Sequence, residues 1–436
     1  MKKLLLASTL LAAMTGTAMA AEIKVGVLLG YTGPIESLTP DMAASAELAF
    51  DEASNSGQLL GGSKIVSIRA DSTCVDSAAA TAAGERLISS HGVVAIMGAD
   101  CSGVTGAVAN NVAIPNGVVM VSPSATSPGL SKIKDNGFFF RTAPSDARQG
   151  EVLATVLKSR GIMEVAVTYT NNDYGKGLSD SFNTAFTGVG GKISITAAHE
   201  DGKADYSAEV GALSAAGSKH LAVFGYLDQG GKGIIQASLD SGAFDNFILA
   251  DGMIGDSIIE AIGKDLNGTI GTLPGGESAG AITFKAMAGK AGIKVGGPFT
   301  AESYDAGALL ALAMQAAGSA DRAAIQANIM SVANAPGEKI VVYGATNANT
   351  NLQHAIWIDG SIFYGSASFE TGERIDLRGF LNEGNKGIFE IKQIVPNVKN
   401  NESGVKGILI VLDNILPSSA EPGYVKYLKY EANKNG

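Results

Sequence analysis

The chain has 436 residues, of which 46% are hydrophobic and 17% are charged, a balance typical of a globular protein and not of a disordered chain. Its 32 basic and 42 acidic residues give a formal net charge of −10 at pH 7. No cluster of Lys and Arg stands out, so the charge pattern argues against a nucleic-acid-binding surface.

The start of the chain has the three parts of a secretory signal peptide. Lys2 and Lys3 supply the positive charge, an apolar run extends from Leu4 to Ala13, and Ala18-Met19-Ala20 is a cleavage site of small residues. The apolar run is too short to cross about 30 Å of hydrocarbon. We therefore expect residues 1–20 to be a cleaved signal peptide. The mature protein should be soluble and outside the cytoplasm, without direct membrane insertion.

The two cysteines, Cys74 and Cys101, would then lie in an oxidising compartment. A lone pair of cysteines in such a compartment usually forms a disulfide. A catalytic or metal-binding role would need neighbouring His or acidic side chains, and neither cysteine has an obvious set. We therefore predict a structural disulfide between them.

Short apolar runs alternate with helix-forming stretches, which predicts alternating strands and helices. In the first series we expect strands at Ile23–Leu29, Lys64–Ala70, Val93–Gly98 and Val118–Ser122, with helices at Met42–Ala53, Ser77–Ser90 and Ser102–Ala113. In the second series we expect helices at Ala147–Arg160, Gly177–Phe186, Tyr206–Ala216 and Gly230–Ser241, with strands at Glu164–Tyr169, Lys192–Ala197, His220–Phe224 and Phe247–Ala250. Such alternation is typical of parallel sheets covered by helices. Two series predict an α/β protein with two doubly wound lobes.

After the second series the regular alternation of strands and helices ends. Helices are expected at Ala279–Lys290, Ala301–Ala317 and Asp321–Ala333, and strand-like segments at Lys339–Val342, Ala355–Ile358, Gly387–Ile394 and Gly407–Leu412. The tail from Pro417 is polar, and we expect it to be extended.

Several short motifs then occur in a characteristic order. They are Ile23–Val27 with Thr32-Gly33-Pro34, Asp71–Cys74, Gly98–Ser102, Ser122–Pro128, Phe140–Asp146 with Gln149-Gly150, Asp173–Gly177, Asp251-Gly252 and Ser303–Ala306. Together they resemble the leucine/isoleucine/valine-binding proteins, which are periplasmic receptors of branched-chain amino-acid ABC importers. The resemblance covers roughly Ile23 to Ala333.

The resemblance implies a type I periplasmic-binding-protein fold, in which two doubly wound parallel-sheet lobes are joined by a hinge and close on a ligand. It implies lobe 1 at 21–142 plus about 277–336, and lobe 2 at 143–276 plus about 337–436. It also implies the Cys74–Cys101 bridge. The expected partners are a small amino acid and a membrane permease, and we expect a monomer.

Residues on the first lobe are expected to bind the polar ends of the ligand. Ser102 begins a helix after a strand, where free backbone N–H groups favour an anion such as a carboxylate. The resemblance implies that Ser102 binds the ligand carboxylate, that the Ser124 carbonyl accepts from its ammonium and that Thr126 supplies a hydroxyl. Simple helix capping by Ser102 and a ligand-free turn between Pro123 and Pro128 remain alternatives.

The second lobe should supply a negative charge, because an unpaired buried ammonium is very costly. Asp251 ends a strand and resembles a position at which the family carries an acidic residue, usually Glu. The resemblance also implies ligand contacts for Tyr174 at the cleft edge and for side chains around the apolar part of the ligand: Tyr31, Leu38 and Tyr226. Simple packing is the alternative for each.

One catalytic pattern occurs, Gly276-Glu277-Ser278-Ala279-Gly280, which fits G-x-S-x-G. The preceding segment is a poor strand, and His354 is the one histidine that follows, so we expect no enzyme. The histidines are isolated, and neither a phosphate-binding loop nor a calcium loop is present, so we expect no metal and no cofactor. Three alternatives stay open: an amide, urea or small carboxylate as ligand, a secreted serine hydrolase using Ser278, and a sensory module serving a chemoreceptor.

Overall fold

The computed structural model describes residues 21–275 and 279–333, together with the backbone of six strands between 342 and 427. The predicted signal peptide, Ser278 and most of the tail from Pro417 lie outside the described residues. The chain divides into a unit that ends at Ala333 and a unit from Asn334 to Gly436. Each unit is described by itself.

The first sheet is wholly parallel and has the strand order β2-β1-β3-β4-β5. Its strands are β1 (Glu22–Leu29), β2 (Lys64–Asp71), β3 (Ala95–Gly98), β4 (Val119–Ser122) and β5 (Phe139–Arg141). The helices after its first three strands are α1 (Thr39–Asn55), α2 (Ser77–Ser89) and α3 (Ser102–Val108), which continues as a π-helical turn at Ala109–Ala113. Parallel pairing places the carboxyl ends of these strands at one edge.

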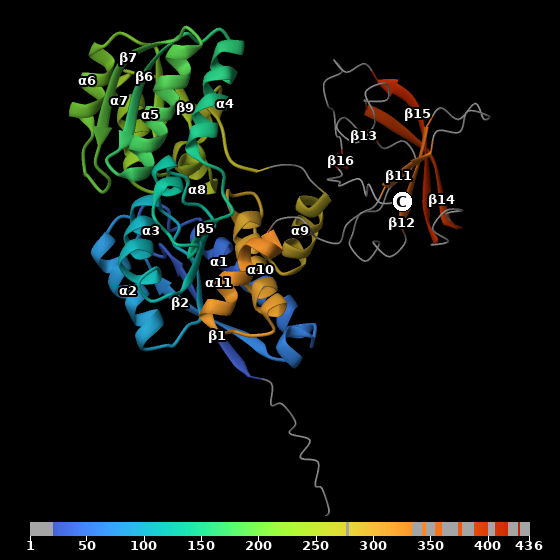
Figure 1. Ribbon diagram of the computed structural model, residues 1–436. Coiled ribbons are helices and arrows are strands. Elements are labelled where there is room, and N and C mark those ends of the chain that lie inside the picture. Colours follow the sequence, from blue (N-terminus) through green and yellow to red (C-terminus); the bar gives the residue numbers. More distant parts are fainter. Residues whose placement is uncertain are drawn as a thin grey trace, which may run out of the picture. The chain divides into compact units, whose positions relative to one another are not determined.

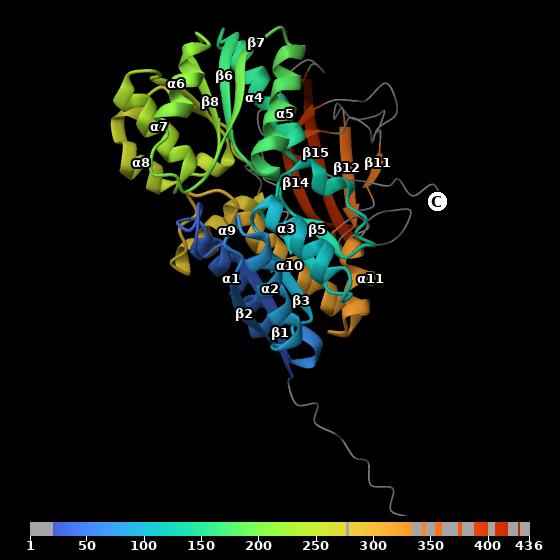
Figure 2. The same ribbon diagram turned by 90° about the vertical axis from the view of Figure 1, so that its left-hand side faces the viewer.

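The second sheet is also wholly parallel, with the order β10-β9-β8-β6-β7. Its strands are β6 (Glu164–Thr170), β7 (Lys192–His199), β8 (His220–Phe224), β9 (Asn246–Leu249) and β10 (Ile270–Gly271). The helices are α4 (Asp146–Ser159), α5 (Asp173–Gly188), α6 (Ser207–Ala215), α7 (Gly230–Ser241) and α8 (Asp256–Ile262). The two sheets confirm the predicted α/β architecture of two parallel lobes (Figures 1 and 2).

Three later helices complete the first unit: α9 (Ala279–Lys290), α10 (Thr300–Ala317) and α11 (Arg322–Ala333). Helix α10 packs against α1 and α11 and contacts β3 and β4 of the first sheet. The chain thus returns to the first sheet after completing the second. The lobe boundaries expected at 277–336 and 337–436 stay a prediction.

The second unit contains a sheet in the order β11-β12-β15-β14-β13-β16. Its strands are β11 (Val342–Ala345), β12 (His354–Asp359), β13 (Arg374–Asp376), β14 (Ile388–Lys399), β15 (Lys406–Leu416) and β16 (Lys426–Tyr427). All pairs are antiparallel except β13 with β16. Four of these strands overlap the predicted strand-like segments or begin where one ends, whereas β13 and β16 were not predicted.

Burial explains which strands were easy to recognise. Strand β4 is buried throughout, and β1 is buried from Val25 to Leu29, because central strands of a parallel sheet are covered on both faces. Strands β5 and β10 have three and two residues, too few to give a pattern, and α8 follows a glycine-containing turn. Sequence reasoning missed all three elements.

Helix α5 begins at Asp173, four residues before the expected start at Gly177. Asn172 caps it, because its side-chain oxygen accepts hydrogen bonds from the backbone N–H groups of Tyr174 (3.0 Å) and Gly175 (3.1 Å). This cap places Tyr174 in the first turn.

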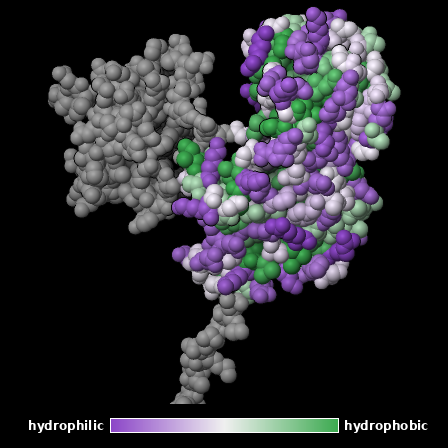
Figure 3. All heavy atoms as spheres, turned by 180° about the vertical axis from the view of Figure 1, so that it is seen from behind, coloured by the Kyte–Doolittle hydropathy of each residue, from purple (hydrophilic) through white to green (hydrophobic). Residues whose placement is uncertain are grey.

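The surface in Figure 3 mixes hydrophilic and hydrophobic side chains, with hydrophilic ones spread over both lobes. Of the helices within the described residues, none combines the length and apolarity needed to cross a membrane.

Candidate ligand-binding site

A small cavity lies where the loops after strands of both sheets meet. The first-sheet side supplies Ile35, Leu38, Met42, Asp100, Cys101, Ser102 and Ser124, the second-sheet side supplies Tyr174, Tyr226, Asp251 and Gly252, and Phe299 completes the lining. About 20 Å³ of it is open to the centre of a water molecule. In this arrangement of the two sheets the open space is about large enough for one or two water molecules.

The structure brings six of the predicted ligand residues to this one cavity: Leu38, Ser102, Ser124, Tyr174, Tyr226 and Asp251. Tyr31 and Thr126 are not among its lining residues. Tyr31 instead packs beneath Arg69, whose guanidinium carbon lies 5.8 Å from the ring centroid. The ligand roles of all eight residues stay predictions.

Ser102 occupies the first position of α3, and the cap position belongs to Cys101. The Ser102 hydroxyl oxygen accepts a hydrogen bond from the Ser127 N–H at 3.0 Å. Since that bond uses an oxygen lone pair, the hydroxyl proton remains free to be donated. Ser102 therefore makes no capping bond, and its geometry allows donation to a carboxylate.

The turn after β4 is held rigidly around Ser124. The Arg141 guanidinium donates to the carbonyls of Ala125 and Ser127, each at 2.9 Å, and the Ser124 hydroxyl donates to the Asp100 carbonyl at 3.1 Å. No hydrogen bond from the described residues reaches the Ser124 carbonyl. That carbonyl can therefore accept from a ligand N–H group.

Asp251 is an acidic residue of the cavity lining and lies at the start of a 3₁₀ turn that follows β9. Its side chain is 2% exposed, and its Oδ1 accepts a hydrogen bond from the Tyr174 hydroxyl at 3.1 Å. The same hydroxyl accepts from the Gly252 N–H at 3.1 Å, and the Tyr174 ring stacks on Tyr226 with centroids 5.2 Å apart. Burial raises the pKa of Asp251 to about 6, with the Tyr174 hydrogen bond opposing the shift. A cation beside this carboxylate would relieve the cost of burying it.

A second buried acid, Asp146, was not predicted as a site residue. It occupies the first turn of α4 and is 0% exposed, and neither carboxyl oxygen makes a hydrogen bond within the described residues. Burial and the charge of Asp251 raise the pKa of Asp146 well above its ordinary value, whereas the nearby Thr126 hydroxyl and Arg141 lower it. Thr126 lies close enough for that effect, although no Thr126–Asp146 side-chain pair has the geometry of a hydrogen bond. Asp146 lies in the motif Phe140–Asp146. That motif contributed to the family resemblance, but it did not indicate that the Asp146 carboxyl is buried.

Asp100 lines the cavity as well but has a different environment. Its carboxylate accepts hydrogen bonds from the Gly30 N–H (2.6 Å), the Ser72 hydroxyl (2.9 Å) and the Cys101 N–H (3.0 Å). Because these hydrogen bonds satisfy the carboxylate oxygens, Asp100 connects the loops after β1, β2 and β3 and does not need a ligand cation. Sequence reasoning missed this role also.

The predicted disulfide is confirmed: Cys74 and Cys101 are bonded, with their Cα atoms 5.1 Å apart. The bridge joins the loop after β2 to the residue that precedes Ser102. It therefore fixes one wall of the cavity.

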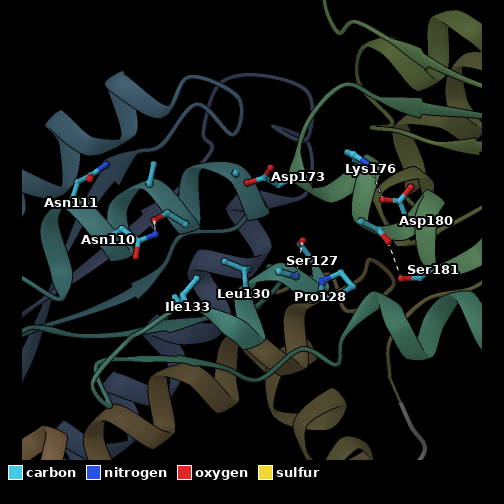
Figure 4. A pocket seen from close by; sticks show the side chains of 15 residues that line it. Asn110, Asn111, Ser127, Pro128, Leu130, Ile133, Asp173, Lys176, Asp180 and Ser181 are labelled. Carbon is cyan, nitrogen blue, oxygen red and sulfur yellow. Dashed lines mark hydrogen bonds and ion pairs between the residues drawn. The ribbon is translucent and has the colours of Figure 1, made fainter.

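A wider groove of about 740 Å³ lies nearby, between α3, the 3₁₀ turn at Pro128–Lys132 and α5 (Figure 4). On α5, Lys176 pairs with Asp180 at 2.7 Å, and the Ser181 hydroxyl donates to the Gly177 carbonyl at 2.8 Å. Among its lining residues, no carboxylate is buried without a partner. The cavity around Asp251 is therefore the better candidate site.

Comparison with known proteins gives a consistent result. Residues 22–357 match the family model described as periplasmic binding protein. The chain is 35% identical over 234 residues to Leu/Ile/Val-binding protein homolog 3 of Brucella melitensis, covering 52% of this chain and 61% of that relative. It is 28% identical to Leu/Ile/Val-binding protein BraC3 of Rhizobium johnstonii, covering 82% and 98%. A leucine-binding protein from Thermotoga maritima superposes with a TM-score of 0.63 at 24% identity, covering 77% of this chain and 95% of that one.

Proposed function

Because the chain belongs to the periplasmic binding protein family, we propose that it is an extracytoplasmic receptor for a small, branched-chain-like amino acid. The receptor delivers its ligand to the membrane permease of an ABC importer. The observation that carries the amino-acid assignment is Asp251, a buried carboxylate without a cationic partner among the described residues, in a cavity that also contains Ser102 and the Ser124 carbonyl.

The chemistry of the cavity matches the two ends of an α-amino acid. The ligand ammonium binds Asp251 and donates to the Ser124 carbonyl, and the ligand carboxylate accepts from the Ser102 hydroxyl. The apolar side chain of the ligand contacts Leu38, Met42 and Phe299, which line the same space. Burying that side chain adds about 25 cal/mol per Å² of apolar surface, so a larger aliphatic group binds more tightly until the space is filled.

Binding is coupled to closure of the two lobes. The lobes are in contact on the rim of the cavity, where the Asp228 N–H donates to the Pro34 carbonyl at 3.1 Å and the Ser37 N–H donates to an Asp228 carboxylate oxygen at 3.0 Å. A ligand that contacts both lobes shifts the equilibrium toward the closed form. The permease then distinguishes loaded from empty receptor by this form. We propose a periplasmic monomer without enzymatic activity.

Calorimetry with the mature protein tests the assignment. We expect binding of leucine, isoleucine or valine, and a loss of at least about tenfold in affinity for Asp251→Ala, since the ammonium would then be buried without a counter-charge. Asp265→Ala, which removes an exposed acid from the same lobe, is the matched control.

Two outcomes would contradict the proposal. Binding confined to amides, urea or small carboxylates would contradict the assignment of Asp251 to a ligand ammonium, although the fold assignment would stand. Covalent labelling of Ser278 by a fluorophosphonate probe would point to a hydrolase instead.

A further inference from the structure

One contact between the two lobes is made by a residue that has no side chain. Gly177 lies near the start of α5, which follows β6 of the second sheet. A Cβ atom at Gly177 would lie 3.0 Å from the Pro128 Cδ and 3.0 Å from the Ser127 Oγ, and the next nearest atom is the Ser127 Cβ at 3.7 Å. Both neighbours follow β4 of the first sheet. The missing side chain therefore faces the opposite lobe.

The segment that α5 contacts is tied to the ligand-binding turn. The Ser127 N–H donates to the Ser102 hydroxyl at 3.0 Å, and the Ser127 carbonyl accepts from the Arg141 guanidinium at 2.9 Å. Ser127 and Pro128 line the groove between α3 and α5 (Figure 4). Because these bonds fix Ser127 relative to Ser102, the segment cannot move away from α5 without disturbing the first-lobe half of the site.

Helix α5 links the same contact to the second-lobe half of the site. Tyr174 lies three residues before Gly177, and residues three apart share one face of a helix. Tyr174 lines the cavity, and its hydroxyl donates to the Asp251 carboxylate at 3.1 Å. How closely α5 approaches the first lobe at Gly177 therefore also determines how closely Tyr174 approaches the ligand.

Another glycine at the lobe contact has a different environment. A Cβ atom at Gly255 would lie 3.1 Å from the Leu38 Cδ2 of the first lobe, but only 2.7 Å from the Leu227 Cδ1 of its own lobe. A side chain there would disturb the second lobe itself. At Gly177 the three nearest atoms all belong to the other lobe, so a side chain at this position acts on closure and not on the packing of α5 within its lobe.

We propose that Gly177 is a positioning residue that sets how closely the two lobes approach each other around the ligand. Its missing side chain lets α5 pack directly against Ser127 and Pro128, which brings Tyr174 and Ser124 to one cavity. A side chain at this position holds the lobes apart and weakens the ligand contacts that need both lobes. This inference rests on the proposed function for the identity of the ligand, but not for the contact between the lobes.

The first test measures leucine affinity by calorimetry for Gly177→Ala and Gly177→Val. One added carbon needs a shift of a few tenths of an ångström, whereas the stiff, branched side chain of valine needs more space. We expect affinity to fall about threefold for alanine and at least about thirtyfold for valine, mainly through faster dissociation. The control is Gly188→Val at the end of α5, where a Cβ atom meets nothing within 4 Å. Wild-type affinity in Gly177→Val would overturn the inference.

Thermal unfolding separates this role from damage to the helix. Alanine and valine both have a higher helix propensity than glycine, so the ligand-free variants should be at least as stable as the wild type. A loss of affinity that is matched by a loss of stability would contradict the inference.

A compensating change on the other lobe gives a second check. Ser127→Ala combined with Pro128→Ala removes the two atoms nearest to the added Cβ. In that background Gly177→Ala should change leucine affinity by less than about twofold, because the contact is relieved. An undiminished effect would show that Gly177 does not act through this segment.

The last test needs no ligand. The Asp228 N–H donates to the Pro34 carbonyl across the two lobes, so its hydrogen exchange reports the closed population. In the ligand-free mature protein we expect protection of this amide to be about tenfold lower in Gly177→Val than in the wild type. Equal protection would overturn the inference whatever the ligand is. Wild-type protein that binds none of leucine, isoleucine and valine would refute the proposed function, and the exchange comparison would still decide the role of Gly177.

Discussion

Arg141 shows how a residue outside the cavity can determine its shape. The guanidinium donates to the carbonyls of Ala125 and Ser127 and to the Ser131 hydroxyl at 2.6 Å. One side chain thus holds the turn after β4, which contains Ser124 and Thr126. A planar guanidinium can reach several acceptors at once, and a lysine ammonium cannot replace that geometry. Arg141 is therefore a positioning residue for Ser124 and Thr126.

We expect Arg141→Lys to weaken amino-acid binding by about tenfold, equal to about 1.4 kcal/mol, while Asp251 and Ser102 remain in place. Calorimetry measures the affinity, and thermal unfolding separates this effect from a general loss of stability. Arg148→Lys is the control, since Arg148 is exposed and pairs only with Glu151 on its own helix. A variant that binds with wild-type affinity would show that the turn holds its shape without Arg141.

Sequence reasoning located most of the site residues along the chain, but it did not reveal which of them are buried or what they contact. Asp251, Tyr174 and Ser102 follow recognisable strand ends or motifs, and the structure brings them to one cavity. Asp146, Arg141 and Asp100 occur in the same motifs, but their roles depend on burial and on contacts between distant turns. Tyr31 and Thr126 are not in the cavity lining, because a position along the chain does not determine the direction of a side chain.

Helix packing in the second lobe depends on one close approach between α4 and α5. A Cβ atom at Gly150 of α4 would lie 2.7 Å from the backbone nitrogen of Phe182 and 2.9 Å from the carbonyl carbon of Ser181. Both are backbone atoms of α5, so the contact cannot be relieved by a side-chain rotation. Gly150 thus allows the two helices to touch.

Gly150→Ala should therefore lower the free energy of unfolding by about 2 kcal/mol, measured by urea denaturation. Gly211→Ala is the matched control, because a Cβ atom at that exposed position of α6 meets nothing within 4 Å. It should stabilise the protein by about 0.5–1 kcal/mol through the higher helix propensity of alanine. Equal effects of the two substitutions would contradict the packing argument.

Elements with a strong pattern were predicted, and those without one were missed. Apolar runs such as Val25–Leu29 reflect strands that are covered on both faces, and the helices between them are long enough to show their periodicity. Strands β5 and β10 are too short to show a sequence pattern, and they are stabilised by hydrogen-bonded pairing with β4 and β9. The mainly antiparallel sheet after residue 341 was predicted only in part, as four separate strand-like segments, because strand pairing is a long-range property.

The arrangement of the lobes as a whole depends on contacts that no local pattern reveals. Asp228 connects the two lobes: its N–H donates to the Pro34 carbonyl, and its carboxylate accepts from the Ser37 N–H and, at 2.6 Å, from the Ser257 hydroxyl. Pro34 and Ser37 follow β1 of the first sheet, whereas Asp228 and Ser257 belong to the second lobe. None of these residues lines the cavity. The contact therefore stabilises closure independently of the ligand.

We expect Asp228→Ala to weaken binding by about tenfold, mainly through faster dissociation, because the closed form loses a contact that the open form does not have. The preference among leucine, isoleucine and valine should not change, since the cavity lining is intact. Stopped-flow dissociation and calorimetry measure the two effects, with Asp240→Ala as control because Asp240 pairs only within its own helix, with Gln236. A changed ligand preference with unchanged dissociation would mean that Asp228 shapes the cavity and does not hold the lobes together.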